Sequence, residues 1–219
     1  MRQRKTQQVI VLVLLLLMTL PNTSKAGIPA DQVRQTADKV LLILQDPRLK
    51  AADKKNERRD QLRQVISARF DFNEMAKSSL GQHWQRRSAD EQRQFVKLFT
   101  DLLERSYADQ IESFNGEKIV YGRETQDQDR AEVDTRIVTR KGEEFAVNYK
   151  LRTTGREWKV YDIVIENISL VNNYRSQFNR VLASSSFAEF LRKLQGKTFD
   201  ATGKAAGRTD GAISQAVES

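Results

Sequence analysis

The 219-residue chain contains no cysteine, only one histidine and only three prolines. Without cysteine it can form no disulfide, no thiolate nucleophile and no cysteine-ligated metal site. The one histidine, His83, stands beside Trp84 and has no second histidine with which to hold a metal ion. The chain also lacks the G-x-S-x-G turn of serine hydrolases and a phosphate-binding glycine loop. We therefore expect no metal, no cofactor and no enzymatic activity.

The N-terminus has the pattern of a secretory signal peptide, predicted over residues 1–26. Three basic residues precede an apolar run, residues 9–20, that is interrupted by one threonine. Pro21 ends the run, and Ser24 and Ala26 supply the small residues of a cleavage site. An uncleaved membrane anchor is the weaker interpretation, because the run is shorter than the ~20 residues that span a bilayer. The mature chain is predicted to be exported.

Length and charge set the remaining limits. Residues 27–197 have the size of a single ordinary domain, and residues 198–219, rich in small residues, are predicted to be a disordered tail. The net charge is +8, but the predicted signal peptide carries four cations and no acid, which leaves +4 for the mature chain. Nucleic acid is disfavoured as a partner, because export removes the protein from it and no basic patch interleaved with aromatics is present.

Helical spacing dominates the first half of the mature chain. Apolar residues recur every three to four positions and predict helices over residues 28–44, 51–70, 72–80 and 88–114. Ser88 and Glu91 form a capping box at the start of the long fourth helix. The charged run at residues 54–60 is predicted to be a solvated face.

From Lys118 the apolar period changes from 3.6 to 2. This period predicts strands over residues 119–121, 131–139, 144–152 and 158–165. Short connections make them an antiparallel meander, followed by a helix through Tyr174 and a closing helix with a capping box at Ser186 and Glu189. We predict an α+β fold: an antiparallel curved sheet of about four strands, covered on one face by N-terminal and C-terminal helices.

Three functions remain open from the residues alone. A lipid carrier needs an apolar cavity between sheet and helices, because a two-chain lipid exposes roughly 30 methylenes at about 0.8 kcal/mol each. A non-catalytic, export-linked adaptor would have a filled core. A small enzyme on a cone-like fold could use Asp162 and Glu166 for acid–base work, although carboxylates at a strand end more often pair with arginine or cap a helix.

Three blocks of sequence resemble the MlaC family, the toluene-tolerance auxiliary proteins of an ABC-type phospholipid transport system. The most specific block, YDIVIENISLVNNYRSQF, spans residues 161–178. The second begins at Phe70 and reaches Trp84, and the third runs from Ser88 to Phe99. The chain departs from the family pattern at Asn167-Ile168, where Gly-Val is usual, and asparagine tolerates the left-handed backbone of such a turn.

The resemblance implies a monomeric periplasmic phospholipid carrier that maintains outer-membrane lipid asymmetry. Its partners would be an outer-membrane lipoprotein–porin complex and an inner-membrane MCE-domain ABC transporter complex. Family members hold acyl chains between sheet and helices, with the headgroup near the surface. On that basis the lipid-binding residues are expected to be Phe72, Met75, Phe99, Leu103, Tyr107, Val133, Ile137, Val147, Tyr149, Val160 and Val164, with Tyr174 at the mouth.

Overall fold

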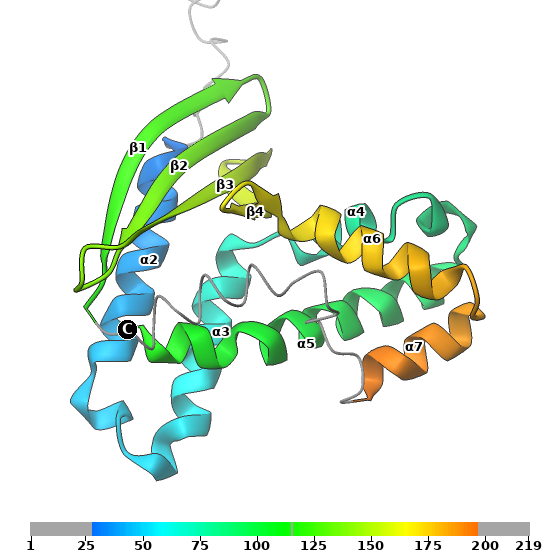
Figure 1. The fold of residues 1–219 in the computed structure, drawn as a ribbon, viewed down its shortest axis with the longest axis horizontal. Coiled ribbons are helices and arrows are strands. Elements are labelled where there is room, and N and C mark those ends of the chain that lie inside the picture. Colours follow the sequence, from blue (N-terminus) through cyan, green and yellow to red (C-terminus); the bar gives the residue numbers. More distant parts are fainter. Residues whose placement is uncertain (1–27, 115, 197–219) are drawn as a thin grey trace, which may run out of the picture.

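The computed structural model describes residues 28–114 and 116–196. The predicted signal peptide, residues 1–26, and the predicted tail, residues 198–219, therefore lie outside the described residues. The fold is α+β, as predicted (Figure 1). Its helices are α2 (Pro29–Gln45), α3 (Lys55–Arg69), α4 (Phe72–Leu80), α5 (Ala89–Ser113), α6 (Leu170–Leu182) and α7 (Phe187–Gln195). Short 3-10 turns precede α3 and α5. No helix among the described residues is long and apolar enough to cross a membrane.

The sheet is antiparallel throughout and follows the chain order β1-β2-β3-β4-β5. Its strands are β1 (Lys118–Asp127), β2 (Arg130–Val138), β3 (Glu144–Thr154), β4 (Glu157–Ile165) and β5 (Ile168–Ser169). The predicted strands are confirmed, β1 extends beyond its predicted end at residue 121, and the two-residue β5 is added. Each longer strand pairs with its sequence neighbour, so the meander follows from short connections alone.

Helix α2 runs beneath the curved sheet (Figure 1). Val33 anchors its N-terminal half, because this side chain is buried in one cluster with Trp158 and Val160 of β4. The Ala30 N–H donates to the Glu124 carboxylate of β1 at 2.8 Å. The first turns of α2 are therefore fixed to the sheet both by apolar packing and by a hydrogen bond.

Helices α4, α5, α6 and α7 pack together beside the sheet as a second layer. Both predicted capping boxes, at Ser88 for α5 and at Ser186 for α7, are present. Phe178 of α6 lies 5.7 Å from Phe95 of α5 and 5.1 Å from Phe190 of α7, ring centroid to ring centroid. Edge-to-face contacts of this kind pack the aromatic rings of α5, α6 and α7 against one another.

The connection from β4 to α6 uses a left-handed backbone at two residues without glycine. Glu166 has φ 48° and Asn167 has φ 66°, so the turn that the family usually builds with glycine is retained by asparagine. Asp162 is buried, and its carboxylate accepts from the Ser169 hydroxyl at 2.6 Å and from the Val171 N–H at 3.0 Å. This carboxylate therefore fixes the start of α6, the structural role that the sequence analysis favoured over acid–base work.

Candidate functional site

A cavity of about 340 Å³ lies between the sheet and the helices α2, α3 and α5. Such a volume falls at the small end of the range for ligand pockets, roughly 300–1,000 Å³. The wall is mostly aliphatic and aromatic. The helices contribute Val33, Ala37, Val40, Leu41, Leu44, Leu62, Ile66, Leu103, Tyr107 and Ile111, and the sheet contributes Ile119, Ile137, Tyr149, Val160, Ile163 and Ile165.

Arg69 is the one charged group where α2, α3 and β4 meet on the described cavity wall. Its guanidinium donates to the Gln32 side-chain oxygen at 2.6 Å, to the Thr36 hydroxyl at 3.1 Å and to the Trp158 carbonyl. Gln32 in turn accepts from the Trp158 N–H at 3.0 Å. Because burial is costly for an unpaired charge, this set of hydrogen bonds keeps the guanidinium satisfied and holds the first half of α2 in place.

A second polar part of the wall joins α3 to α5. Glu112 accepts from Arg58 at 2.5 Å and from Arg59, and Arg59 also reaches Asp109 at 2.6 Å. Burial alone would raise the pKa of Glu112, but the hydrogen bonds from Arg58 and Arg59 outweigh it and lower the pKa below its usual 4.5. The prediction of a solvated face at residues 54–60 is therefore wrong for these two arginines, because α5 supplies carboxylates opposite them.

Tyr149 brings a phenol to the cavity. Protein surrounds its side chain, and burial, with a smaller contribution from nearby Tyr121, raises the pKa of Tyr149 to about 12. The phenol therefore stays neutral at physiological pH and cannot serve as a base. It adds a hydrogen-bonding group to the wall without adding a charge.

Seven of the twelve predicted site residues lie on the cavity wall. They come from α4, α5 and strands β2, β3 and β4, and they are Phe72, Met75, Leu103, Tyr107, Ile137, Tyr149 and Val160. The structure brings these residues together from segments far apart in the sequence, as the expected sheet–helix arrangement requires.

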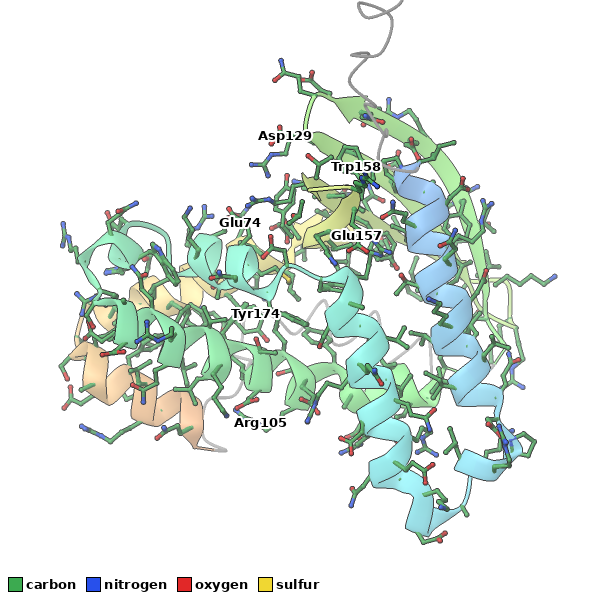
Figure 2. All side chains as sticks on the ribbon, turned by 180° about the vertical axis from the view of Figure 1, so that it is seen from behind. Glu74, Arg105, Asp129, Glu157, Trp158 and Tyr174 are labelled. Atoms are coloured by element: carbon green, nitrogen blue, oxygen red, sulfur yellow. The ribbon has the colours of Figure 1, made fainter. Side chains whose placement is uncertain are left out.

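Phe99 and Tyr174 lie in the filled helical layer instead. Both are fully buried, and their rings meet edge to face at 5.4 Å. Figure 2 shows Tyr174 among α4, α5 and α6, away from the sheet and α2. The expectation of Tyr174 at the cavity mouth does not match this position, because α6 turns it toward α5.

The remaining three predicted residues belong to the sheet but not to the wall. Val133 packs in the buried cluster that joins the sheet to α2. Val147 is also buried, and it lies on β3 opposite Thr135 of β2. Val164 points to the opposite face, because the ladder between β3 and β4 shifts register after Val160. This bulge inserts Tyr161 and reverses the alternation, so Ile163 and Ile165 line the cavity where simple alternation predicted Val164.

Sequence reasoning missed the contribution of α2 and α3 to the wall. The apolar spacing of α2 predicts which face of the helix is inward. It does not predict whether the sheet and the neighbouring helices pack closely against that face. The same holds for Ile111 and Phe114 at the end of α5. The small Ala37 in the middle of the α2 stripe is no signal of a cavity, because alanine is common in filled cores too.

The described residues contain no group of histidine, cysteine or carboxylate side chains that could hold a metal ion. His83 does not line the cavity, and its Nε2 lies 3.0 Å from the side-chain oxygen of Asn179. Glu166 accepts from the Ala146 N–H at the end of the sheet. The arrangement offers an enclosed apolar surface with charges confined to two places on its wall.

The fold and the cavity define a class: α+β proteins in which a curved antiparallel sheet and helices enclose an apolar chamber. The model of the MlaC protein family matches residues 34–196, and the chain belongs to this family. Among its relatives is the toluene tolerance protein ttg2D of Pseudomonas putida, 27% identical over 158 residues that cover 71% of this chain and 74% of that protein.

A second relative is the intermembrane phospholipid transport system binding protein MlaC of Haemophilus influenzae, 23% identical over 168 residues, or 74% of this chain and 78% of that protein. A solved structure of similar fold is the phospholipid-binding protein of Ralstonia solanacearum in complex with a phospholipid. It is 26% identical, with a TM-score of 0.68 over 77% of this chain and 96% of that one.

Proposed function

We propose that this protein is a phospholipid-binding transport protein that carries acyl chains in the cavity between its sheet and α2, α3 and α5. The observation that carries the proposal is the cavity of about 340 Å³ with its mostly apolar wall. A structurally similar family member that was solved with a phospholipid supports the ligand class. The seven predicted residues on the wall, from Phe72 to Val160, would contact the chains.

The physical reason is the cost of leaving hydrocarbon in water. Each methylene that the cavity covers contributes about 0.8 kcal/mol, and this contribution is non-directional, so chains of different length and saturation are accommodated. Polar groups in the middle of such a wall would require partners that a hydrocarbon chain cannot supply. On the wall the Arg69 charge is satisfied by hydrogen bonds to neutral groups, and the charges along the α3–α5 contact are paired, which fits this requirement.

The two alternatives lose support from the same cavity. An adaptor with a filled core needs a sheet–helix interface without empty space. An enzyme needs an acid or base that changes its protonation state, whereas the ion pairs on the described wall join carboxylates to arginines, which keep their protons.

We further propose that the protein acts as a monomer in the periplasm after removal of the predicted signal peptide. There it would shuttle phospholipid between an outer-membrane lipoprotein–porin complex and an inner-membrane MCE-type ABC transporter, and so maintain outer-membrane lipid asymmetry. The name of the Haemophilus relative, an intermembrane transport component, supports this part of the proposal.

Native mass spectrometry tests lipid binding directly. The full-length chain is expressed in a Gram-negative host, purified from the periplasm without detergent, and sprayed under native conditions, and the bound lipid is then extracted and identified. We expect phospholipid at near one molecule per protein. A protein that arrives without lipid, and that takes up none from fluorescently labelled vesicles, would contradict the proposal.

A further inference from the structure

The exposure of the wall residues indicates where the cavity meets solvent. Of the described residues that line it, only Arg63 and Ser67 are exposed, and the rest are buried or half-buried. These two positions are one turn apart on α3. The most exposed part of the described lining therefore lies beside this turn of α3.

Helix α5 lies opposite this turn. Two ion pairs join α3 to α5: Arg59 with Glu112, and Arg63 with Glu104. The Arg59–Glu112 pair is half-buried and lies at one end of this contact. Ser67 and Thr100, each one turn beyond the second pair on its own helix, have short side chains and line the cavity at the other end.

The Arg63–Glu104 pair stands between these two ends. Arg63 donates to both carboxylate oxygens of Glu104, with Nε at 3.0 Å from one of them. The side chains are 56% and 29% exposed, and solvent screening weakens an ion pair this open to water. Water can solvate both charged groups when the two side chains separate.

A guanidinium that donates hydrogen bonds to both oxygens of a carboxylate has the geometry to donate to two oxygens of a phosphate as well. Arg59 is hydrogen-bonded to two carboxylates, and Arg69 is enclosed where α2, α3 and β4 meet. Among the described residues Arg63 is hydrogen-bonded to Glu104 alone, with the exposed Asp60 carboxylate 3.8 Å away. Arg63 is the arginine of the described wall that combines access to the cavity with access to solvent.

We propose that the cavity opens between Arg63 and Glu104, and that Arg63 exchanges the Glu104 carboxylate for the phosphate of the bound lipid. The acyl chains pass inward beside Ser67 and Thr100, and the phosphate remains at the rim. This inference rests on the proposed function, and it assigns the ligand class to lipids that carry a phosphate next to their chains.

Two variants that break the same ion pair distinguish two roles for it. In one role Arg63 binds the phosphate, and in the other the pair only holds α3 and α5 together. Arg63→Gln removes the guanidinium, whereas Glu104→Gln leaves it without its carboxylate competitor. Delipidated protein is mixed with vesicles that contain either a fluorescent phospholipid or a diacylglycerol with the same chains. Arg93→Gln is the control, because Arg93 forms an exposed pair with Asp90 at the far end of α5.

We expect Arg63→Gln to lower phospholipid loading about three- to tenfold, as for one charged hydrogen-bonded partner at a half-exposed site. Glu104→Gln should increase phospholipid loading, because it removes the carboxylate that competes with the phosphate, and neither variant should alter diacylglycerol loading. A loss of the same size in both variants, or an equal loss for diacylglycerol, would overturn the exchange with phosphate.

The position of the mouth is tested independently, because the natural chain has no cysteine. Ser67→Cys is labelled with a bulky maleimide in the delipidated protein, with Ser176→Cys on the exposed face of α6 as the control. We expect the label at residue 67 to block loading and the label at residue 176 to leave it unchanged. Equal loading of both labelled proteins would place the mouth elsewhere.

The wild-type protein distinguishes this inference from the proposed function. If the wild type carries no lipid at all, the proposed function fails. If the wild type loads normally while Arg63→Gln and labelled Ser67→Cys load equally well, only the assignment of the mouth and of Arg63 fails.

Discussion

The two halves of α5 contact two different kinds of interior. Its N-terminal half contributes Phe95 and Phe99 to the layer with α4, α6 and α7, where aromatic rings meet at 5–6 Å and the side chains are fully buried. Its C-terminal half contributes Tyr107 and Ile111 to the cavity beneath the sheet. One continuous amphipathic stripe thus serves a filled core and a hollow one.

The partners of α5 explain the difference. In the filled layer, helices pack on helices, and their ridges and grooves interlock closely. Beneath the sheet, α2 is fixed at its first turns by Val33 and Ala30, while its second half lines the cavity together with α3. A curved sheet above straight helices leaves a gap that aliphatic side chains border without filling. The filled layer provides rigidity, and the hollow half provides room for a ligand.

The largest expected effect is a loss of stability in the filled layer. Phe178→Ala should destabilise the protein by about 3–5 kcal/mol, because the ring is fully buried among four other aromatic rings. For a chain of this size this corresponds to a fall in Tm of about 10 °C. Phe72→Ala is the matched control on the cavity wall, and we expect about half the effect, because Phe72 is half-buried. Equal falls in thermal unfolding would contradict the distinction between the two regions.

Alkaline pH should affect the hollow half through Tyr149. Its pKa is raised to about 12 in the folded protein, so this contribution to stability is complete below the unfolded value of about 10 and is lost as pH rises toward 12. The difference corresponds to at most about 2.7 kcal/mol. Unfolding by urea at pH 8 and pH 11 should show wild type losing stability relative to Tyr149→Phe. If the difference in unfolding free energy between the two proteins is the same at pH 8 and pH 11, the raised pKa of Tyr149 is refuted.

Filling the cavity should reduce loading without harming the fold. Ala37→Phe places a ring from α2 into the empty space, and we expect phospholipid loading to fall about tenfold, equivalent to about 1.4 kcal/mol, with Tm unchanged or raised. Ala68→Phe, on an exposed position of α3, is the control. Loading from labelled vesicles measures the effect, and normal loading of Ala37→Phe would show that the chains lie elsewhere.

The smallest effect concerns acid. Hydrogen bonds from Arg58 and Arg59 lower the pKa of Glu112 below 4.5 despite its burial, so its contribution is present above pH 4.5 and is lost as pH falls through the lowered value. Thermal unfolding between pH 7 and pH 3 should show a steeper decline for wild type than for Glu112→Gln. Parallel curves would mean that the α3–α5 ion pairs do not contribute to acid sensitivity.

Much of the fold could be predicted from local pattern. The capping boxes at Ser88 and Ser186, the change of period at Lys118 and the turn at Asn167 each depend on a few adjacent residues, and each is present in the structure. The candidate site could be predicted only in part. Alternation placed Ile137, Tyr149 and Val160 on the wall, but it failed at Val164, because a bulge is a property of two paired strands.

The sequence by itself determined which faces of the helices and strands are apolar, because amphipathic periodicity is written along a single segment. Only the tertiary structure decided whether those faces meet closely, as at Phe99 and Tyr174, or stand apart, as at Ala37 and Ile137. It also decided that Arg63 has access both to a cavity and to solvent. The physical reason is that no single segment of the sequence encodes a cavity. A cavity arises from the curvature and spacing of elements that are distant in the chain.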